Sequence, residues 1–128
     1  MVPVLVEISP GELLDKLTIL QIKSQRIMDG AKLANVLREL ETLAAVWAKV
    51  APHPPAELQS VTSELRTVNE TLWDVEDALR RAEAAGDFGR DFVELARSVY
   101  RHNDRRSALK RQINELLGSR LMEEKSYG

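Results

Sequence analysis

Residues 58–79, LQSVTSELRTVNETLWDVEDAL, decide the fold of this chain. Apolar side chains recur along this stretch at alternating spacings of three and four residues, at Leu58, Val61, Leu65, Val68, Leu72, Val75 and Leu79. An unbroken heptad pattern of this length predicts one long helix with a single apolar side, roughly 40 Å from end to end. The sequence therefore predicts an all-α protein organised around this helix.

A second stripe of side chains lies beside the apolar seam. Asn69, Trp73, Glu76 and Arg80 recur at spacings of four, three and four residues, and Asp77 follows Glu76. A surface helix needs only one ordered face, so we expect the second stripe to contact another element or a ligand. The simpler alternative is that Glu76 and Arg80 form an ordinary i, i+4 ion pair on an exposed face, which contributes about 0.2–0.5 kcal/mol.

Three more helices are predicted around the long one, over residues 10–28, 31–51 and 88–117. Each of these segments carries apolar residues at helical spacing. Because a short turn joins the long helix to residues 88–117, these two helices are expected to form an antiparallel hairpin. The predicted fold is an antiparallel bundle of four main helices in a single domain of residues 1–128.

Local signals mark the ends of these helices. Ser9 followed by a proline is typical of a helix start, and Glu12 is expected to complete a capping box with Ser9. The proline-rich segment PHPP at residues 52–55 separates the second helix from the third. The segment AAGDFG at residues 84–89 ends the third helix, and Asp87 is expected to cap the fourth.

The two ends of the chain lie outside the predicted helices. Residues 1–8 form a short extended arm, in which VPVLVEI has the β-branched composition of a strand. Residues 119–128 form a polar tail that is expected to dock loosely or to fray. Four helices of this length can close a bundle alone, but a lone strand and a continuous apolar seam both favour pairing with a second copy. We therefore expect a homodimer.

The composition excludes several classes of function. The 128 residues include no cysteine and two histidines, His53 and His102, which excludes disulfides, thiolate zinc sites, cysteine nucleophiles and histidine-rich metal sites. A net charge of −2 with both signs interspersed argues against nucleic acid as a partner. The longest apolar run is too short to span a bilayer, and the N-terminus lacks a basic signal-peptide region. We expect a soluble cytoplasmic protein without membrane insertion.

The predicted helix over residues 88–117 has a polar break in its apolar seam. Its apolar positions form two groups, Phe92, Leu95 and Val99, then Leu109, Ile113 and Leu116. Between them lies RHNDRR, residues 101–106, which places His102 and Arg106 at seam positions. Buried charge is costly, so these residues must meet water, an opposite charge or a ligand. The structural alternatives are a kink after which Asn103-Asp104 caps a fresh helix, or a polar layer that fixes register.

The predicted hairpin brings the second stripe and this polar break together. With the turn near Gly86, residues whose numbers sum to about 172 share a height, because both helices rise equally per residue. Asn69 then lies level with Asn103, and Trp73 with Tyr100. We therefore expect a polar cleft between these two helices. Its candidate ligand-binding residues are Asn69, Trp73, Glu76, Asp77, Arg80, Tyr100, Asn103, Arg106 and Lys110.

Basic residues gather in the same helix, at Arg97, Arg101, Arg105, Arg106, Lys110 and Arg111. Arginine presents a planar fork of donors that suits anions such as phosphate. A solvated basic face is the alternative interpretation. The sequence contains no phosphate-binding glycine loop, no nucleophile elbow and no His–carboxylate triad. A ligand of the predicted cleft is therefore expected to be a small anion.

Several segments together resemble a small bacterial family of uncharacterised proteins: SPGELLDKLTILQIK, KLANV, NETLWDVED, ELARSVYRHNDRRSALKRQINELLG and EEKSY. The resemblance covers nearly the whole chain. It implies an all-helical protein encoded near genes for lipopolysaccharide glycosyltransferases, and it implies no established activity. A second uncharacterised family has a similar pattern, N-x-x-L-W-x-x-E-D-x-x-R followed by K-R-x-I-[DN]. The matching positions are Asn69, Leu72, Trp73, Glu76, Asp77, Arg80, Lys110, Arg111, Ile113 and Asn114.

Two non-enzymatic functions are compatible with these patterns. The first is a dimeric binding module whose polar cleft takes a small anionic ligand or a protein of cell-envelope biosynthesis. The second is a purely structural helical dimer without a pocket, in which the polar residues only fix the register. Neither function requires a cofactor.

The third hypothesis is an enzyme that resembles the all-helical nucleoside triphosphate pyrophosphatases. In those enzymes carboxylates on helices hold magnesium against a pyrophosphate, and the family pattern is E-x-x-E followed by E-x-x-D. This chain has Glu12-x-x-Asp15 and Asp74-x-x-Asp77 but no E-x-x-E. The departure disfavours magnesium chemistry, which remains the alternative to the binding module.

Overall fold

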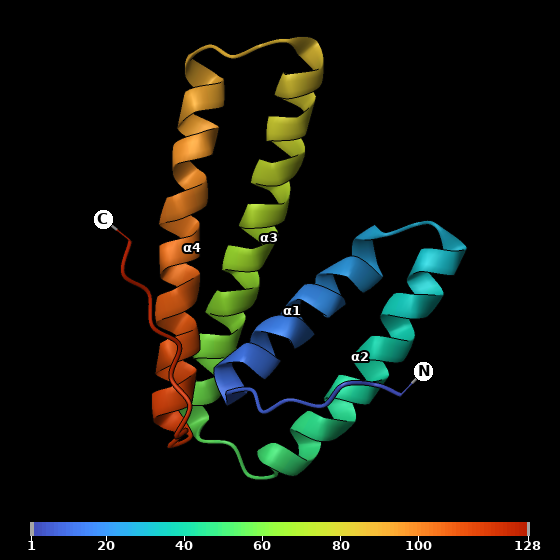
Figure 1. The fold of residues 1–128 in the computed structure, drawn as a ribbon, viewed down its shortest axis with the longest axis vertical. Helices are drawn as coiled ribbons and strands as arrows, with labels where there is room; N and C mark the ends of the chain where they lie inside the picture. Colours follow the sequence, from blue (N-terminus) through green and yellow to red (C-terminus); the bar gives the residue numbers. More distant parts are fainter. Residues whose placement is uncertain (1, 128) are drawn as a thin grey trace.

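The computed structural model describes residues 2–127, which fold into helices and irregular segments without a strand. The helices are α1 (Pro10–Arg26), α2 (Gly30–Val50), α3 (Ala56–Ala85) and α4 (Arg90–Leu116). The prediction of an all-α helical bundle is confirmed (Figure 1). Met1 and Gly128, the outer ends of the predicted arm and tail, lie outside the described residues.

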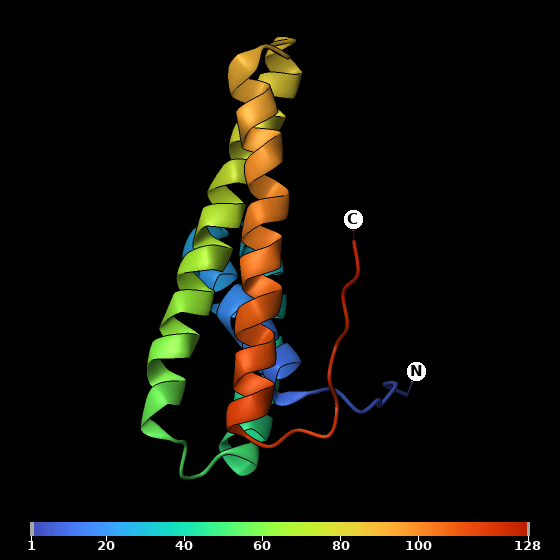
Figure 2. The ribbon, with the colours of Figure 1, turned by 90° about the vertical axis from the view of Figure 1, so that its left-hand side faces the viewer.

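The helices are arranged as two hairpins of different length. The longer hairpin consists of α3 and α4, which lie side by side along their whole length (Figure 1 and Figure 2). In the shorter hairpin, α1 packs against α2 and also against α3 and α4. The shorter hairpin covers only the lower half of the longer one in Figure 1. The half of the α3–α4 hairpin nearest its turn is therefore left without a helical neighbour.

The hydrophobic core lies where α1 crosses the lower half of the α3–α4 hairpin. Its buried members are Leu13, Leu14, Leu17, Leu58, Val61, Leu65, Val68, Leu109 and Ile113. Leu65 and Ile113 are completely buried. The predicted seam of α3 is thus confirmed from Leu58 to Val68 and at Val75, which are buried, whereas Leu72, which packs against the core, and Leu79 are only half-buried.

The start of α1 differs from the prediction in one respect. Ser9 is the N-cap, and its hydroxyl accepts a hydrogen bond from the Glu12 N–H at 3.2 Å, as expected. The Glu12 carboxylate contacts the Lys110 ammonium at 2.7 Å instead of completing the capping box. A charged partner on a neighbouring helix therefore replaces the local partner that the sequence suggested.

The turn between α3 and α4 is built around Gly86, which adopts a left-handed conformation with φ 68°. The N–H groups of Gly86 and Asp87 donate to the carbonyls of Glu83 and Ala82 at 3.1 and 2.9 Å, which is the Schellman pattern. The prediction that Asp87 caps α4 is wrong. Its carboxylate accepts the Gly89 N–H at 3.2 Å within the turn, and Gly89 precedes α4 without a side-chain cap.

Both ends of the chain extend from the same end of the molecule. The arm, residues 2–8, projects from the start of α1 with its apolar side chains in solvent, and Leu5 is 91% exposed (Figure 2). Its base is held by an ion pair between Glu7 and Arg120. The tail, residues 119–127, reverses direction after α4 and runs back along it (Figure 1). Among the described residues, none of the helices combines the length and the apolar composition of a membrane-spanning segment.

Candidate functional site

The predicted ligand-binding residues do not gather in one cleft between α3 and α4. Asn69, Trp73, Glu76, Asp77 and Arg106 line a hollow of about 340 Å³ that α1 closes from the other side. Tyr100, Asn103 and Lys110 line a separate groove on α4. Arg80 lies farther up the hairpin, at the edge of a shallow apolar groove. The prediction of one polar cleft between α3 and α4 is therefore wrong. Helix α1 crosses this hairpin, and Asn69 and Arg106 bond to its Asp15.

The polar break RHNDRR leaves α4 uninterrupted. The helix is continuous from Arg90 to Leu116, so Asn103-Asp104 does not cap a fresh helix and that alternative is wrong. Arg97, Arg101 and Arg105 are exposed, as expected for a solvated basic face. Arg106 instead turns toward α1, where it meets a buried carboxylate.

That carboxylate belongs to Asp15, which is 1% exposed. Arg106 Nε donates to Asp15 Oδ1 at 2.8 Å, and a second guanidinium nitrogen contacts Oδ2. Asn69 Nδ2 donates to Asp15 Oδ1 at 3.0 Å and to Thr18 Oγ1 at 2.9 Å. The Thr18 hydroxyl in turn donates to the Asp15 carbonyl at 2.8 Å. Helices α1, α3 and α4 are thereby joined by one polar network.

This network fulfils a structural role. The hydrogen bond to Asp15 raises the pKa of Arg106, although burial opposes the charged form. Among residues 2–127, no buried side-chain nitrogen or oxygen lacks a hydrogen-bond partner, so the buried atoms of the network are satisfied by the protein itself. Asn69 and Arg106 thus fit the alternative of a polar layer that fixes register.

Sequence reasoning missed Asp15 and Thr18 as members of this layer. The signal was present, because Asp15, Thr18 and Ile22 recur at spacings of three and four residues on α1. All three are buried in the structure. A carboxylate at such a position predicts a buried partner on another helix, although the spacing does not identify that partner.

The rest of the polar stripe on α3 packs against the end of α1. The Arg26 guanidinium lies 5.8 Å from the centre of the Trp73 ring and 2.5 Å from the Asp74 carboxylate. Glu76 and Arg80 form an exposed i, i+4 pair at 3.7 Å, which matches the simpler interpretation of these two residues. The stripe therefore contacts α1 near Trp73 and solvent beyond it.

The close approach of α1 to α4 positions the second candidate site. The Asn114 amide oxygen accepts the Gly11 N–H at 2.7 Å, which satisfies a free donor at the start of α1. A Cβ atom at Gly11 would lie 2.3 Å from the Lys110 carbonyl oxygen. Only a glycine permits this contact, and the contact brings Glu12 within reach of the Lys110 ammonium.

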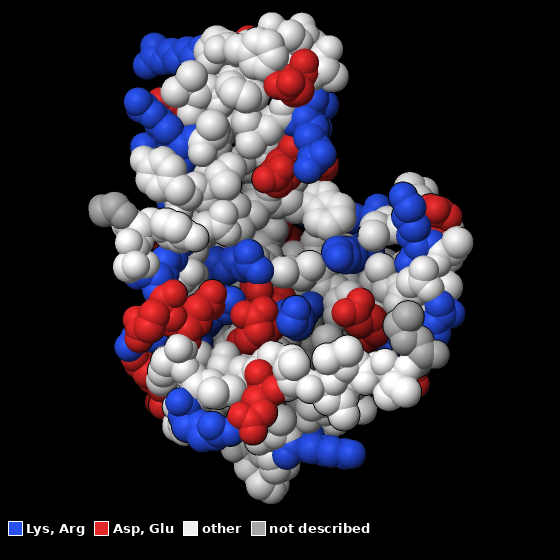
Figure 3. Space-filling view, viewed as in Figure 1, with Lys and Arg blue, Asp and Glu red and all other residues white. Residues whose placement is uncertain are grey.

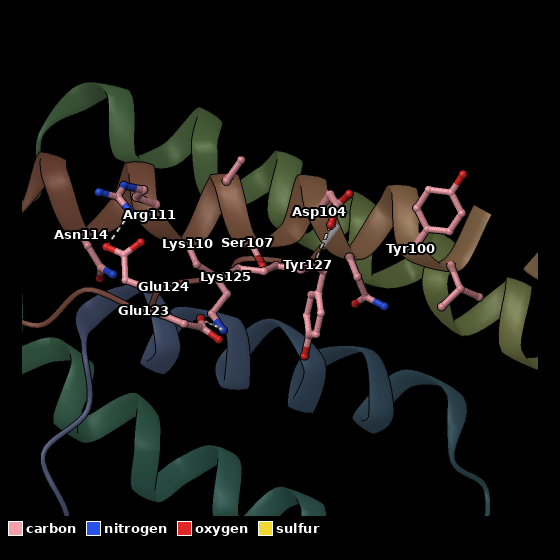
Figure 4. A pocket seen from close by; sticks show the side chains of 13 residues that line it. Tyr100, Asp104, Ser107, Lys110, Arg111, Asn114, Glu123, Glu124, Lys125 and Tyr127 are labelled. Carbon is pink, nitrogen blue, oxygen red and sulfur yellow. Dashed lines mark hydrogen bonds and ion pairs between the residues drawn. The ribbon is translucent and has the colours of Figure 1, made fainter. Parts of the chain in front are cut away.

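A groove of about 750 Å³ lies on α4 beside this contact, and we call it the α4 groove (Figure 4). Residues of α4 form its floor, and residues of the tail form its outer wall: Val99, Tyr100, Asn103, Asp104, Ser107, Ala108, Lys110, Arg111 and Asn114, with Glu123, Glu124, Lys125 and Tyr127. Both signs of charge alternate in a band over this part of the surface (Figure 3).

Lys110 is the central cation of the α4 groove. Its side chain is only 10% exposed, and its ammonium contacts Glu12 at 2.7 Å and Glu123 of the tail at 2.9 Å. Burial lowers the pKa of Lys110, but the hydrogen bonds to Glu12 and Glu123 and the nearby charge of Asp15 outweigh this effect. The pKa of Lys110 is therefore raised above its ordinary value of 10.5.

The raised pKa of Lys110 predicts a pH dependence of stability on the alkaline side. The stabilisation is complete below pH 10.5 and is lost as the pH rises through the raised pKa of the folded state. Replacing Lys110 by methionine should lower the Tm by an amount that is constant from about pH 6 to about pH 10, where both glutamates are ionised, and shrinks above it. Circular dichroism melts of both proteins across this range measure the difference, and a difference that grew with pH would contradict the assignment.

Three of the four carboxylates of the alternative enzyme hypothesis are paired with cations. Asp15 pairs with Arg106, Glu12 with Lys110, and Asp74 with Arg26. Within residues 2–127, no three histidine or acidic side chains are close enough together to hold a metal ion.

Comparison with known proteins assigns the chain to a family. Residues 4–128 match the family described as "Family of unknown function (DUF6165)". The chain belongs to this family. No curated protein and no solved structure matches the sequence of this chain. The match to DUF6165 includes the tail and most of the arm, so both terminal segments belong to the family's sequence pattern as well as the helices.

Proposed function

We propose that this DUF6165 chain is a non-enzymatic binding module that takes a small anionic ligand in the α4 groove. The observation that carries the proposal is Lys110, whose side chain is nearly buried and yet lines an open groove. Arg111 adds a second cation, and the side chains of Asn103 and Ser107 add neutral donors. Such a set of donors suits phosphate or carboxylate oxygens.

The size and chemistry of the groove support a small molecule. Its volume of about 750 Å³ falls within the range of roughly 300–1,000 Å³ that is usual for small-molecule sites. The gene neighbourhood implied by the resemblance described above favours a phosphorylated or acidic sugar precursor of lipopolysaccharide, present in the cytoplasm. Nucleotide sugars and inorganic pyrophosphate are therefore the first compounds to test.

We expect pyrophosphate or a nucleotide sugar to bind the wild-type protein and to bind the Lys110→Met variant about 10–100-fold more weakly. This factor corresponds to the loss of one charge-assisted hydrogen bond, about 1.5–3 kcal/mol. Isothermal titration calorimetry measures the Kd directly. Lys32→Met, which removes an exposed lysine from α2, is the matched control and should leave the Kd unchanged. Equal affinity of Lys110→Met and wild type would refute the proposal.

We also propose self-association through the uncovered half of the α3–α4 hairpin. A shallow groove of about 450 Å³ lies there, lined by Leu79, Phe92, Ala96 and Val99 with charged residues at its rim. The upper hairpin shows a largely uncharged centre between charged edges (Figure 3). The heptad seam continues past the region that α1 covers, so a second identical hairpin offers the same spacing and would complete a four-helix section.

Sedimentation equilibrium tests this proposal. The wild-type protein is expected to dimerise, and Ala96→Glu is expected to weaken the dimer at least about tenfold, because it places a charge in the apolar groove without removing a core side chain. Ala44→Glu, at an exposed alanine of α2, is the matched control. A wild-type protein that stays monomeric at concentrations of about 100 µM would refute the proposed dimer, because its dissociation constant would then lie well above this concentration.

A further inference from the structure

We propose that the tail, residues 119–127, acts as a strap across the α4 groove: its carboxylates hold the cations of α4, and an anionic ligand must displace them in order to bind. The inference rests on the anion binding proposed above and adds its regulation. In Figure 4 the tail residues line the groove opposite α4, with Glu124 directed toward Arg111. The carboxylates of the tail thereby occupy the positions at which an anionic ligand would meet the cations of α4.

The tail is seated in a specific register. Three consecutive tail residues each meet an opposite charge on α4, in the pairs Glu123–Lys110 at 2.9 Å, Glu124–Arg111 at 3.3 Å and Lys125–Asp104 at 2.8 Å. A shift by one residue would bring the Lys125 ammonium to Arg111 and create repulsion. Each acidic residue of this segment pairs with a cation of α4, and its lysine pairs with an aspartate of α4. The order of charges along the tail therefore matches α4, in addition to the total charge.

The root of the tail is fixed to the helix. Gly118 adopts a left-handed conformation with φ 64°, and the N–H groups of Gly118 and Ser119 donate to the carbonyls of Glu115 and Asn114 at 3.2 and 2.8 Å. This Schellman turn reverses the chain and directs it back along α4. Asn114 also holds the start of α1 through its side chain, so the turn is anchored at the α1–α4 contact.

The remainder of the tail is held weakly enough to be displaced. Glu124–Arg111 and Lys125–Asp104 are surface ion pairs, and such a pair contributes only about 0–1 kcal/mol. Glu123 is also exposed, although its partner Lys110 is nearly buried. No residue of the tail belongs to the hydrophobic core cluster or to the apolar side chains packed against it. Release of the tail leaves Lys110 paired with Glu12 and Arg111 paired with Glu115, and a ligand with two anionic groups can then replace Glu123 and Glu124 on these two cations.

The decisive experiment uses the full-length protein with Glu123→Gln and Glu124→Gln combined, and pyrophosphate as the probe. If the tail occupies the groove nine-tenths of the time, removing its two charges should tighten the apparent Kd by about tenfold. Ser126→Ala, at an exposed tail residue that does not line the groove, is the control and should leave the Kd unchanged. Unchanged affinity of the double variant, with normal binding to wild type, would overturn the strap while leaving the proposed function intact.

A peptide of residues 119–128 provides a second measurement that does not depend on pyrophosphate. We expect the labelled peptide to bind the double variant in trans, as read by fluorescence anisotropy, and to lose this binding when Lys110 is also replaced by methionine. Peptide binding without any pyrophosphate binding would support the seated tail and refute the small-anion function. If the peptide does not bind the double variant, the proposal that the tail acts as a strap across the α4 groove is wrong.

Trypsin cleavage after Lys125 reports the position of the tail in the wild-type protein. Saturating pyrophosphate is expected to accelerate this cleavage, because a displaced tail is accessible to the protease. Cleavage that slowed on addition of pyrophosphate would show that the ligand binds with the tail in place, and it would overturn the inference.

Discussion

Replacing Arg106 by alanine is expected to lower the free energy of unfolding by about 3–5 kcal/mol, because it leaves the buried Asp15 carboxylate without its charged partner. Asn69 alone would then donate to that carboxylate from another side chain. A loss of this size is a large part of the stability of a small domain, which is about 5–15 kcal/mol in total. Urea unfolding followed by circular dichroism measures the change.

Arg105 provides a control on the same turn of α4. It pairs with Glu64 across the exposed side of the hairpin, so Arg105→Ala should cost only about 0–1 kcal/mol. The combined variant Asp15→Leu/Arg106→Leu should recover much of the stability lost in Arg106→Ala, since no uncompensated charge remains. A loss below about 1 kcal/mol for Arg106→Ala would show that Asp15 reaches water in solution.

Gly11→Ala is expected to cost about 3 kcal/mol, at the upper end of the range for overpacking a tight contact. The added Cβ would lie 2.3 Å from the Lys110 carbonyl oxygen, which belongs to the backbone of α4 and cannot rotate away. The helices must separate to accept it, and this strains the hydrogen bond from the Gly11 N–H to Asn114. Thermal or urea unfolding measures the effect.

Gly30→Ala is the matched control for this substitution. Gly30 is the first residue of α2, and a Cβ atom there would meet nothing within 4 Å. Alanine at such a position restricts the unfolded chain, so the control is expected to gain about 0.4–1 kcal/mol. If both variants changed stability equally, the close crossing of α1 and α4 would not exist in solution.

Local patterns predicted the helices with only small errors at their ends. The seam of residues 58–79 lies within α3, Ser9 caps α1, and Gly86 ends α3 in the expected turn. These features depend on side-chain spacing and on backbone preferences within a few residues. The wrong details, the capping box of Glu12 and the cap by Asp87, are places where a polar side chain found another partner.

The candidate site was predicted less completely. Equal heights on a hairpin correctly predict that α3 and α4 are neighbours, but they contain no information about α1. In the structure the carboxylate of Asp15 on α1 accepts hydrogen bonds from both Asn69 and Arg106, so these residues form a polar layer between three helices. Lys110 was identified, whereas its tail partner Glu123 was not, because a polar terminal segment carries no periodic signal.

The sequence by itself determined the helices, their apolar faces and the α3–α4 hairpin, because each follows from interactions between residues close together in the chain or joined by a short turn. Only the tertiary structure decided how α1 crosses that hairpin and where the tail lies. Asp15 and Arg106 are 91 residues apart, and Gly11 and Asn114 are 103 residues apart. Such contacts depend on shape and charge across the assembled helices, and spacing along the chain does not encode which distant partner satisfies a buried polar group.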